Sequence, residues 1–330
     1  MKSVLRQLFE HKPLDFTQAR EVMLRMSEGA FNEHELSAFM TVYLMRSITI
    51  EELLGFREAL ISLSRKVDLA QEILLDIVGT GGDGKDTFNI STLSCFVAAG
   101  AGLKIAKHGN YGASSISGAS NVMEQIGYKF TNDADLLKKQ IEAAGICFMH
   151  APLFHPALKT VAAIRKNLSV RTFFNMLGPI VNPAAPSAQL LGVSNMALAR
   201  TYTYLLQTIS KRFTIIHSLD GYDEISLTYD TKIITQDGEQ IKSPESLSGI
   251  FVKPEALSGG TNKEEAAAIF INILEGKGTD AQNKVVITNA AMGLQCAGLY
   301  NNYQDAFLAA SESLEGKKAL RCLKKLLSTQ

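Results

Sequence analysis

The sequence predicts an α/β protein that begins with helices and continues into a mainly parallel sheet. Two patterns lead to this prediction. Residues 1–66 show helical periodicity and no strand signal, and from residue 73 short apolar runs alternate with helical segments. Strands that alternate with helices form parallel sheets through right-handed crossovers.

The composition limits the size class and the partners of the protein. Its 330 residues suit one large domain with a smaller one, or two domains. Lys+Arg and Asp+Glu both number 33, so the overall charge attracts neither nucleic acid nor an anionic membrane. The four cysteines lie far apart without a C-x-x-C motif, which favours a reducing compartment over a disulfide scaffold or a zinc site.

The chain also lacks the signals of membrane insertion and export. No apolar run reaches the length of about 18 residues that a membrane span needs. The first residues carry frequent charges instead of a signal peptide's apolar stretch. We expect a cytoplasmic protein with no membrane and no nucleic-acid partner.

The helical start carries its own boundary signals. Asn32 with Glu35, and Thr49 with Glu52, have the spacing of capping boxes, and Gly29 is placed as a helix C-cap. The apolar residues of 39–45 are expected to pack on another domain or subunit, or to form a plain bundle wall.

The sheet is predicted from apolar runs of strand length. These runs cover residues 73–78, 103–106, 146–149, 188–193, 213–218 and 284–288. Residues 232–247 add a small β excursion that turns at Asp237-Gly238. Parallel sheets bind ligands at the carboxyl ends of their strands, where two glycine-rich loops and an acidic pair fall.

The first loop, GTGGDGKDTFNIST (residues 79–92), fits parts of two nucleotide motifs. A dinucleotide fold needs its helix at the glycines, but the apolar helical pattern starts only near Thr92. A P-loop needs Ser or Thr after Lys85, where Asp86 stands. The glycines and the side-chain donors before the helix still suit a phosphate or diphosphate, and a plain connector is the alternative.

The second loop, KHGNYGASSISGASN (residues 107–121), offers many donors and one fixed positive charge to anionic oxygens. The acidic pair, Asp223-Glu224, follows a predicted strand. Adjacent acids there are ordinary turn residues, or they are the hard oxygen ligands that Mg²⁺ requires.

Arg165 lies on an apolar helical stripe with Val161 and Leu168. A buried arginine needs an anion, and a carboxylate would satisfy its guanidinium with two hydrogen bonds. The alternative is an arginine that extends its head group to water.

Together these segments resemble the anthranilate phosphoribosyltransferase family over nearly the whole chain. The resemblance rests on GTGGDG-x-x-TFNIST, KHGN-x-x-x-SS-x-SG, APLFHPALK, RTFFNMLGPIVNPA, QLLGV and DEIS. It implies a small all-helical domain plus a larger α/β domain with a central, mainly parallel sheet flanked by helices. The helical domain would be residues 1–66, completed by helices near 156–182, and the α/β domain residues 72–155 and 183–330. A homodimer through the helical domain is also implied.

The resemblance implies a transferase of tryptophan biosynthesis. Phosphoribosyl diphosphate (PRPP) and anthranilate would give N-(5-phosphoribosyl)anthranilate and diphosphate, with Mg²⁺ as cofactor. Ser91, Asp223 and Glu224 match the metal ligands, whereas Asn110, His108 and Arg165 match groups that position anthranilate. The remaining matches to the family's substrate-binding residues are Gly79, Gly82, Asp83, Thr87, Asn89, Ile90, Thr92, Lys107, Gly109, Tyr111, Gly112, Ala113, Ser114, Ser115 and Ala119.

The second loop departs from the family's common form. Tyr111 replaces an arginine, Ile116 a lysine and Ala119 a serine, and Asn121 stands where an acid is frequent. Because two positive charges near a polyanion are missing, we expect weaker binding of PRPP with the same reaction.

Two rival functions remain. A pyrimidine nucleoside phosphorylase is longer and differs in its second loop. A non-catalytic nucleic-acid-binding relative should lose KHGN and the acidic pair and gain positive charge, whereas this chain keeps both motifs at zero net charge.

Overall fold

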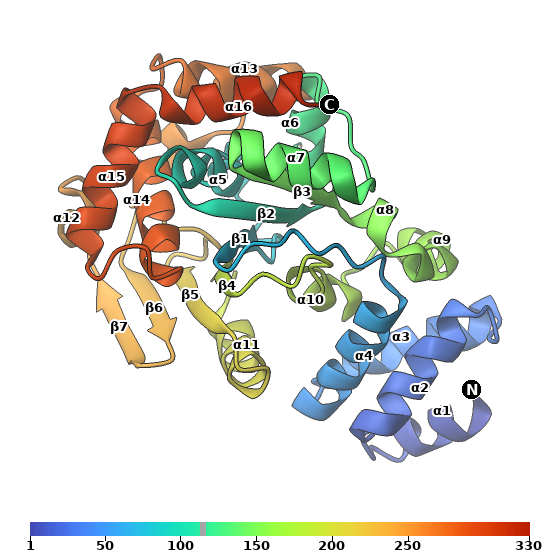
Figure 1. The fold of residues 1–330 in the computed structure, drawn as a ribbon. Helices are drawn as coiled ribbons and strands as arrows, with labels where there is room; N and C mark the ends of the chain where they lie inside the picture. Colours follow the sequence, from blue (N-terminus) through green and yellow to red (C-terminus); the bar gives the residue numbers. More distant parts are fainter. Residues whose placement is uncertain (113–116) are drawn as a thin grey trace. The chain divides into compact units, whose positions relative to one another are not determined.

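The computed structural model describes residues 1–112 and 117–330, which form two compact units. The helical unit comprises residues 1–67 and 151–185, and the sheet unit comprises residues 68–150 and 186–330 (Figure 1). Residues 151–155, which were expected in the larger domain, belong to the helical unit. The α/β class with a separate helical part is confirmed.

The helical unit contains α-helices and short 3₁₀ turns in the part of the chain that is described. The helices are α1 (Lys2–Phe9), α2 (Phe16–Ser27), α3 (Glu33–Met45), α4 (Ile50–Leu63), α8 (Ala151–Phe154), α9 (Lys159–Leu168) and α10 (Phe174–Leu177), with 3₁₀ turns at Pro156–Leu158 and Gly178–Ile180. The predicted capping boxes at Asn32 and Thr49 are present, and a third at Asp15 was missed. Gly29 follows α2 with a φ of 72°, as a C-cap glycine should.

The apolar residues 39–45 divide between an interior and a surface. Phe39 and Tyr43 are buried and contact the ring of Phe173, with centroids 5.9 and 4.9 Å away. Leu44 and Met45 on the same helix are 44% and 83% exposed. The face therefore forms a bundle core and leaves a pair of apolar side chains outside it.

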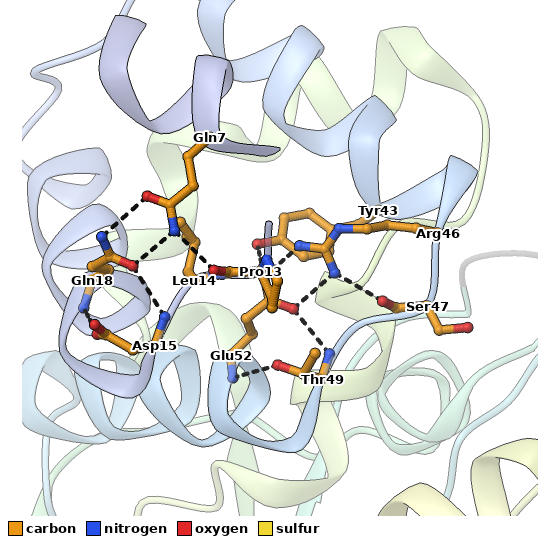
Figure 2. Close-up of polar contacts among 10 residues, drawn as sticks. All are labelled: Gln7, Pro13, Leu14, Asp15, Gln18, Tyr43, Arg46, Ser47, Thr49 and Glu52. Carbon is orange, nitrogen blue, oxygen red and sulfur yellow. Dashed lines mark hydrogen bonds and ion pairs between the residues drawn. The ribbon is translucent and has the colours of Figure 1, made fainter. Parts of the chain in front are cut away.

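A buried carboxylate joins three segments of the helical unit (Figure 2). The Glu52 side chain has no exposed surface and forms an ion pair with Arg46. It also accepts hydrogen bonds from Tyr43 Oη (3.0 Å) and from the backbone N–H groups of Leu14 (3.0 Å) and Thr49 (2.9 Å). Burial raises the pKa of Glu52, but the hydrogen bonds from Arg46 and the backbone outweigh burial and hold it below its usual value.

The sheet unit is built on seven strands in the order β3-β2-β1-β4-β5-β6-β7 within the described chain. The first five in this order are parallel, and β6 and β7 form an antiparallel hairpin at the edge. Their bounds are β1 (Leu74–Gly79), β2 (Lys104–Gly109), β3 (Ile146–His150), β4 (Ala188–Gly192), β5 (Arg212–Ser218), β6 (Thr231–Thr235) and β7 (Gly238–Lys242). The first five predicted strands and the excursion at Asp237-Gly238 are confirmed.

Helices cover this sheet and enclose an apolar core (Figure 1). Helix α5 packs on β1 and β2, α7 on β3, and α14 on β4 and β5, while α11 also contacts β5. The helices are α5 (Ile90–Gly100), α6 (Ala119–Gln125), α7 (Ala134–Ala144), α11 (Met196–Thr208), α12 (Pro244–Ser248), α13 (Lys263–Leu274), α14 (Asp280–Cys296), α15 (Tyr303–Glu315) and α16 (Lys318–Ser328), with a 3₁₀ turn at Pro254–Leu257.

The predicted strand at residues 284–288 is wrong, because these residues lie inside α14. The run KVVIT has the β-branched composition of a strand. A capping box at Thr279 with Gln282 starts the helix, and residues 285–294 are buried around its circumference. Because a fully buried helix shows no apolar stripe, periodicity could not separate it from a strand.

Two further sequence expectations can be compared with the structure. All four cysteines are free, as their spacing predicted. No helix among the described residues is long and apolar enough to cross a membrane.

Candidate active site

Two glycine-rich loops and an acidic pair follow the carboxyl ends of three strands of the parallel part of the sheet. The first loop follows β1, the second loop follows β2, and the acidic pair follows β5, which only β4 separates from β1. Hydrogen bonds join all three: Gly81 N–H donates to Asp223 Oδ2 (2.6 Å), and Asn89 Nδ2 donates to the Ser117 carbonyl (3.1 Å). The sequence placed these segments together correctly.

The first loop bends through residues with positive φ. Gly81, Gly82 and Gly84 have φ values of 67°, 75° and 72°, and Asp86 shares this left-handed region at 46°. Helix α5 begins at Ile90, earlier than the predicted start near Thr92, but residues 85–89 still separate it from the glycines. The loop therefore lacks the direct glycine-to-helix junction of a dinucleotide fold.

The backbone of the first loop surrounds the acidic pair. Glu224 Oε1 accepts from the Ser91 N–H (2.9 Å), and Oε2 accepts from Thr87 Oγ1 (3.2 Å). With the bond from Gly81 to Asp223, both carboxylates are tied to the loop. Asp223 is 7% exposed and Glu224 is 9% exposed, so neither is an ordinary surface turn residue.

Two strand ends need glycine to leave room for Asp223. A Cβ on Gly79 would lie 2.4 Å from Asp223 Oδ2, and a Cβ on Gly192 would lie 1.6 Å from the Asp223 carbonyl oxygen. Both distances are far inside van der Waals contact. The glycines that end β1 and β4 are therefore required by the position of this carboxylate.

Among the described residues, no basic side chain forms an ion pair with the acidic pair. Burial raises the pKa of Asp223 to about 7, and the charge of Asp83 adds to this effect. Burial, with the charges of Asp223 and Asp83, also raises the pKa of Glu224 well above its usual value. Within residues 1–112 and 117–330, the ion pairs found include neither carboxylate of the acidic pair.

This donor set fits Mg²⁺ that is shared with a substrate. The described residues contain no group of three His, Cys, Asp or Glu side chains arranged to hold a metal by themselves. Mg²⁺ commonly uses one or two carboxylates and takes its other ligands from water and substrate phosphates. Asp223 and Glu224, with Ser91 at the start of α5, supply that kind of partial site.

Two residues that fix the acidic pair were not predicted. Ser218 Oγ donates to the Glu224 carbonyl (2.7 Å). Asn289 on α14 accepts from the Ile225 N–H (3.0 Å) and donates back to the Ile225 carbonyl (2.8 Å). The available sequence signal for Asn289 was a single asparagine within the buried segment of α14. The incorrect strand prediction for residues 284–288 obscured this signal.

Lys107 and His108 begin the second loop with buried side chains. Lys107 is 2% exposed, and its Nζ donates to the Ile77 carbonyl near the end of β1 (2.7 Å). The His108 backbone N–H donates to Asp76 Oδ1 (3.2 Å). The Lys107 ammonium is therefore held inside the sheet unit, at the Ile77 carbonyl.

Asn110 and Tyr111 follow at the surface. Asn110 Oδ1 accepts from the Tyr111 N–H (2.8 Å). The Tyr111 hydroxyl donates to Glu124 (3.3 Å), and its ring meets the edge of His150 with centroids 4.9 Å apart. The residue that replaces the family's arginine is thus bound to its own domain.

The other predicted substrate residues have mixed settings. Ile90 and Thr92 are fully buried, so their side chains belong to the core. Gly109 ends β2 and Ala119 begins α6, while Gly112 lies between them. The predicted residues Ala113, Ser114 and Ser115, and the departure at Ile116, lie outside the described residues.

Arg165 is on α9 and belongs to the helical unit, whereas the other predicted site residues belong to the sheet unit. Its guanidinium lies over the Phe174 ring, 5.2 Å from the centroid, and burial lowers its pKa. No ion pair to Arg165 occurs among the residues that the structure describes. Val161 is buried on the same helix, as the predicted stripe requires.

Comparisons with known proteins agree with this geometry. A model described as "Glycosyl transferase family, a/b domain" matches residues 71–320, and one described as "Glycosyl transferase family, helical bundle domain" matches residues 2–64. The anthranilate phosphoribosyltransferase of Flavobacterium johnsoniae is 55% identical over 99% of this chain and 98% of its own length. The chain belongs to the anthranilate phosphoribosyltransferase family. The same enzyme of Bacteroides thetaiotaomicron is 51% identical over 99% of this chain and 98% of its own length.

Solved members of the anthranilate phosphoribosyltransferase family have the same fold. The enzyme of Thermus thermophilus is 31% identical, with a TM-score of 0.92 over 98% of each chain. The enzyme of Saccharomyces cerevisiae, solved in complex with PRPP and Mg, is 27% identical, with a TM-score of 0.90 over 99% of this chain and 96% of that one.

Proposed function

We propose that this chain transfers the 5-phosphoribosyl group of PRPP to the amine of anthranilate, releasing diphosphate, with Mg²⁺ as cofactor. The observation that carries the proposal is the buried acidic pair, which is tied to the first loop and lacks a basic partner among the described residues. Family membership makes PRPP and anthranilate the substrates of choice. The product, N-(5-phosphoribosyl)anthranilate, places the enzyme in tryptophan biosynthesis.

Asp223, Glu224 and Ser91 would hold the cation. Bound Mg²⁺ supplies positive charge to the diphosphate oxygens, which makes diphosphate a better leaving group. The pKa values of Asp223 and Glu224 are raised first by burial and then by neighbouring negative charge, and a bound cation would stabilise the ionised carboxylates against both effects.

The two loops would bind the phosphates of PRPP. In the first loop, the glycine backbone comes close to a ligand without side-chain obstruction. Asn89 links both loops, so one ligand can contact them together. Lys107 contributes its positive charge from its buried position at the Ile77 carbonyl, and the buried residues Ile90 and Thr92 contribute backbone groups only.

Arg165, Asn110 and His108 would orient anthranilate. The Arg165 guanidinium can donate two parallel hydrogen bonds to a carboxylate, and it packs over the Phe174 ring. Asn110 lies exposed at the end of β2, and His108 is buried beside it. We assign all three to positioning, because the reaction requires alignment of a weakly nucleophilic amine with C1 of the ribose.

A fluorescence assay tests this function. Anthranilate is mixed with PRPP and Mg²⁺, and the loss of its fluorescence is followed for the wild type and for Asp223→Asn. Loss that requires all three components and fails in Asp223→Asn supports the proposal. Persistent fluorescence with the wild type at high PRPP would refute it.

We also propose a cytoplasmic homodimer formed through the helical unit. Phe9, Leu44 and Met45 are exposed apolar side chains of this unit, at 61%, 44% and 83%. The four free thiols suit a reducing compartment. Sedimentation should give a dimer for the wild type and a monomer for Met45→Glu, and a wild-type monomer would contradict the assembly.

A further inference from the structure

One side-chain oxygen joins the two flanks of the second loop. Asn121 Oδ1 accepts hydrogen bonds from the N–H groups of Gly112 (2.9 Å) and Gly118 (3.0 Å). Asn121 itself is only 9% exposed. Because Asn121 is buried and its oxygen accepts two hydrogen bonds at once, this oxygen restrains the backbone at Gly112 and Gly118.

The flanks approach each other so closely that only glycine fits. A Cβ on Gly118 would lie 2.2 Å from the nitrogen of Gly112. A second bond, from the Ser120 N–H to the Asn110 carbonyl (3.2 Å), lies beside the contact. The position of Asn110 therefore depends on the same closure that Asn121 maintains.

The closure also reaches the first loop. Asn89 Nδ2 donates to the carbonyl of Ser117, the residue before Gly118. Movement of Gly118 away from Gly112 would displace this carbonyl and weaken the link between the loops. The Asn121 acceptor, at the end of the second loop, thus supports the geometry of both loops.

We propose that Asn121 is a positioning residue for PRPP. Its amide oxygen holds Gly112 and Gly118 together, so that these two glycines, and Ser117 bonded to Asn89 of the first loop, are in place before PRPP binds. The proposal rests on the proposed function, and it adds a residue that contacts the loop instead of the substrate.

The experiment compares Asn121→Leu with Asn121→Asp. Leucine has similar size but no acceptor, whereas aspartate keeps one. Loss of both hydrogen bonds should raise KM for PRPP about tenfold or more. KM for anthranilate, and kcat at saturating PRPP, should stay within about twofold, and Asn121→Asp should change KM for PRPP less than about threefold.

A matched control separates positioning from general stability. Asn302 caps α15 through a bond from the Asp305 N–H (2.9 Å), so Asn302→Leu also removes a side-chain acceptor from backbone N–H. This variant should lower the melting temperature and leave KM for PRPP unchanged. If Asn121→Leu does not fold, Asn121→Ala removes the same acceptor and gives the same comparison.

Calorimetric binding of inorganic diphosphate with Mg²⁺ tests Asn121 separately from the reaction. Asn121→Leu should bind it about tenfold more weakly than the wild type. Unchanged diphosphate affinity and an unchanged KM for PRPP would overturn the proposal. A fall in kcat accompanied by equal rises in KM for PRPP and KM for anthranilate would also overturn it. If the wild type fails to consume anthranilate, the proposed function fails, while the diphosphate comparison still decides the role of Asn121.

Discussion

Buried carboxylates in the two units have opposite settings. Glu52 in the helical unit forms an ion pair with Arg46, and its pKa lies below the usual value. Asp223 and Glu224 in the sheet unit have raised pKa values, first because they are buried and then because the charge of Asp83 acts on them. A buried charge that carries its own counter-ion serves the fold, whereas one that lacks it indicates a site for an external cation.

The largest effect should come from breaking the balanced carboxylate. Glu52→Leu leaves Arg46 without its ion pair and Tyr43, Leu14 and Thr49 without their acceptor. We expect a loss of about 3–5 kcal/mol in the free energy of unfolding, measured by urea denaturation. The folded fraction should keep its specific activity.

Glu51 gives a matched control on the same helix, because it is exposed. Glu51→Gln should change the free energy of unfolding by no more than about 0.5 kcal/mol. If Glu52→Leu is as stable as this control, the network does not support the helical unit.

The next effect concerns the unbalanced pair. Asp223→Asn keeps an acceptor for the Gly81 N–H but removes a proposed metal ligand. Turnover of anthranilate should fall about 100-fold or more, while the free energy of unfolding stays the same or rises. Asp237→Asn, at the exposed β6–β7 turn, should change neither quantity. Destabilisation by Asp223→Asn comparable to that of Glu52→Leu would show that the two carboxylates do not differ.

The pH dependence of stability should sharpen the contrast. The pKa of Asp223 is about 7 in the fold against 3.8 in the unfolded chain, so between these values the folded state holds the extra proton. Without Mg²⁺, stability due to Asp223 is full below about pH 4 and falls as pH rises to about 7, by at most about 1.4 kcal/mol per pH unit. Denaturation of Asp223→Asn should lack this component. A constant difference between the two proteins across that range would contradict the raised pKa.

The smallest effect is expected at Tyr111, which lies outside both carboxylate groups. Tyr111→Arg removes the hydroxyl bond to Glu124 and adds a positive charge to the second loop. KM for PRPP should fall by a factor of about five, equal to about 1 kcal/mol, at low ionic strength. An unchanged KM would mean that the departure from the family pattern at this position has no effect on affinity.

The grouping of the two loops and the acidic pair was predictable from the sequence because each follows a strand of a parallel sheet, whose carboxyl ends share one edge. The loops after β1 and β2 and the acidic pair after β5 meet at one edge of a parallel sheet, and each has its own local signal. The α14 helix was not predictable in this way. Its buried β-branched residues resemble a strand, and only tertiary packing makes them helical.

Long-range hydrogen bonds were also beyond sequence reasoning. Asn289 bonds Ile225, 64 residues away, and Glu52 bonds Leu14, 38 residues away. Neither partner could be inferred from spacing. The contact of Lys107 with the Ile77 carbonyl depends on which face of the sheet its side chain occupies, and the motif KHGN does not specify that face.

Calorimetric titration of inorganic diphosphate, with and without Mg²⁺, most directly tests whether the acidic pair is the cation site. It compares the wild type with the double variant Asp223→Asn/Glu224→Gln. Mg²⁺ should tighten diphosphate binding to the wild type about 100-fold or more and have little effect on the double variant. Equal tightening in both proteins would contradict the account and would place the cation elsewhere.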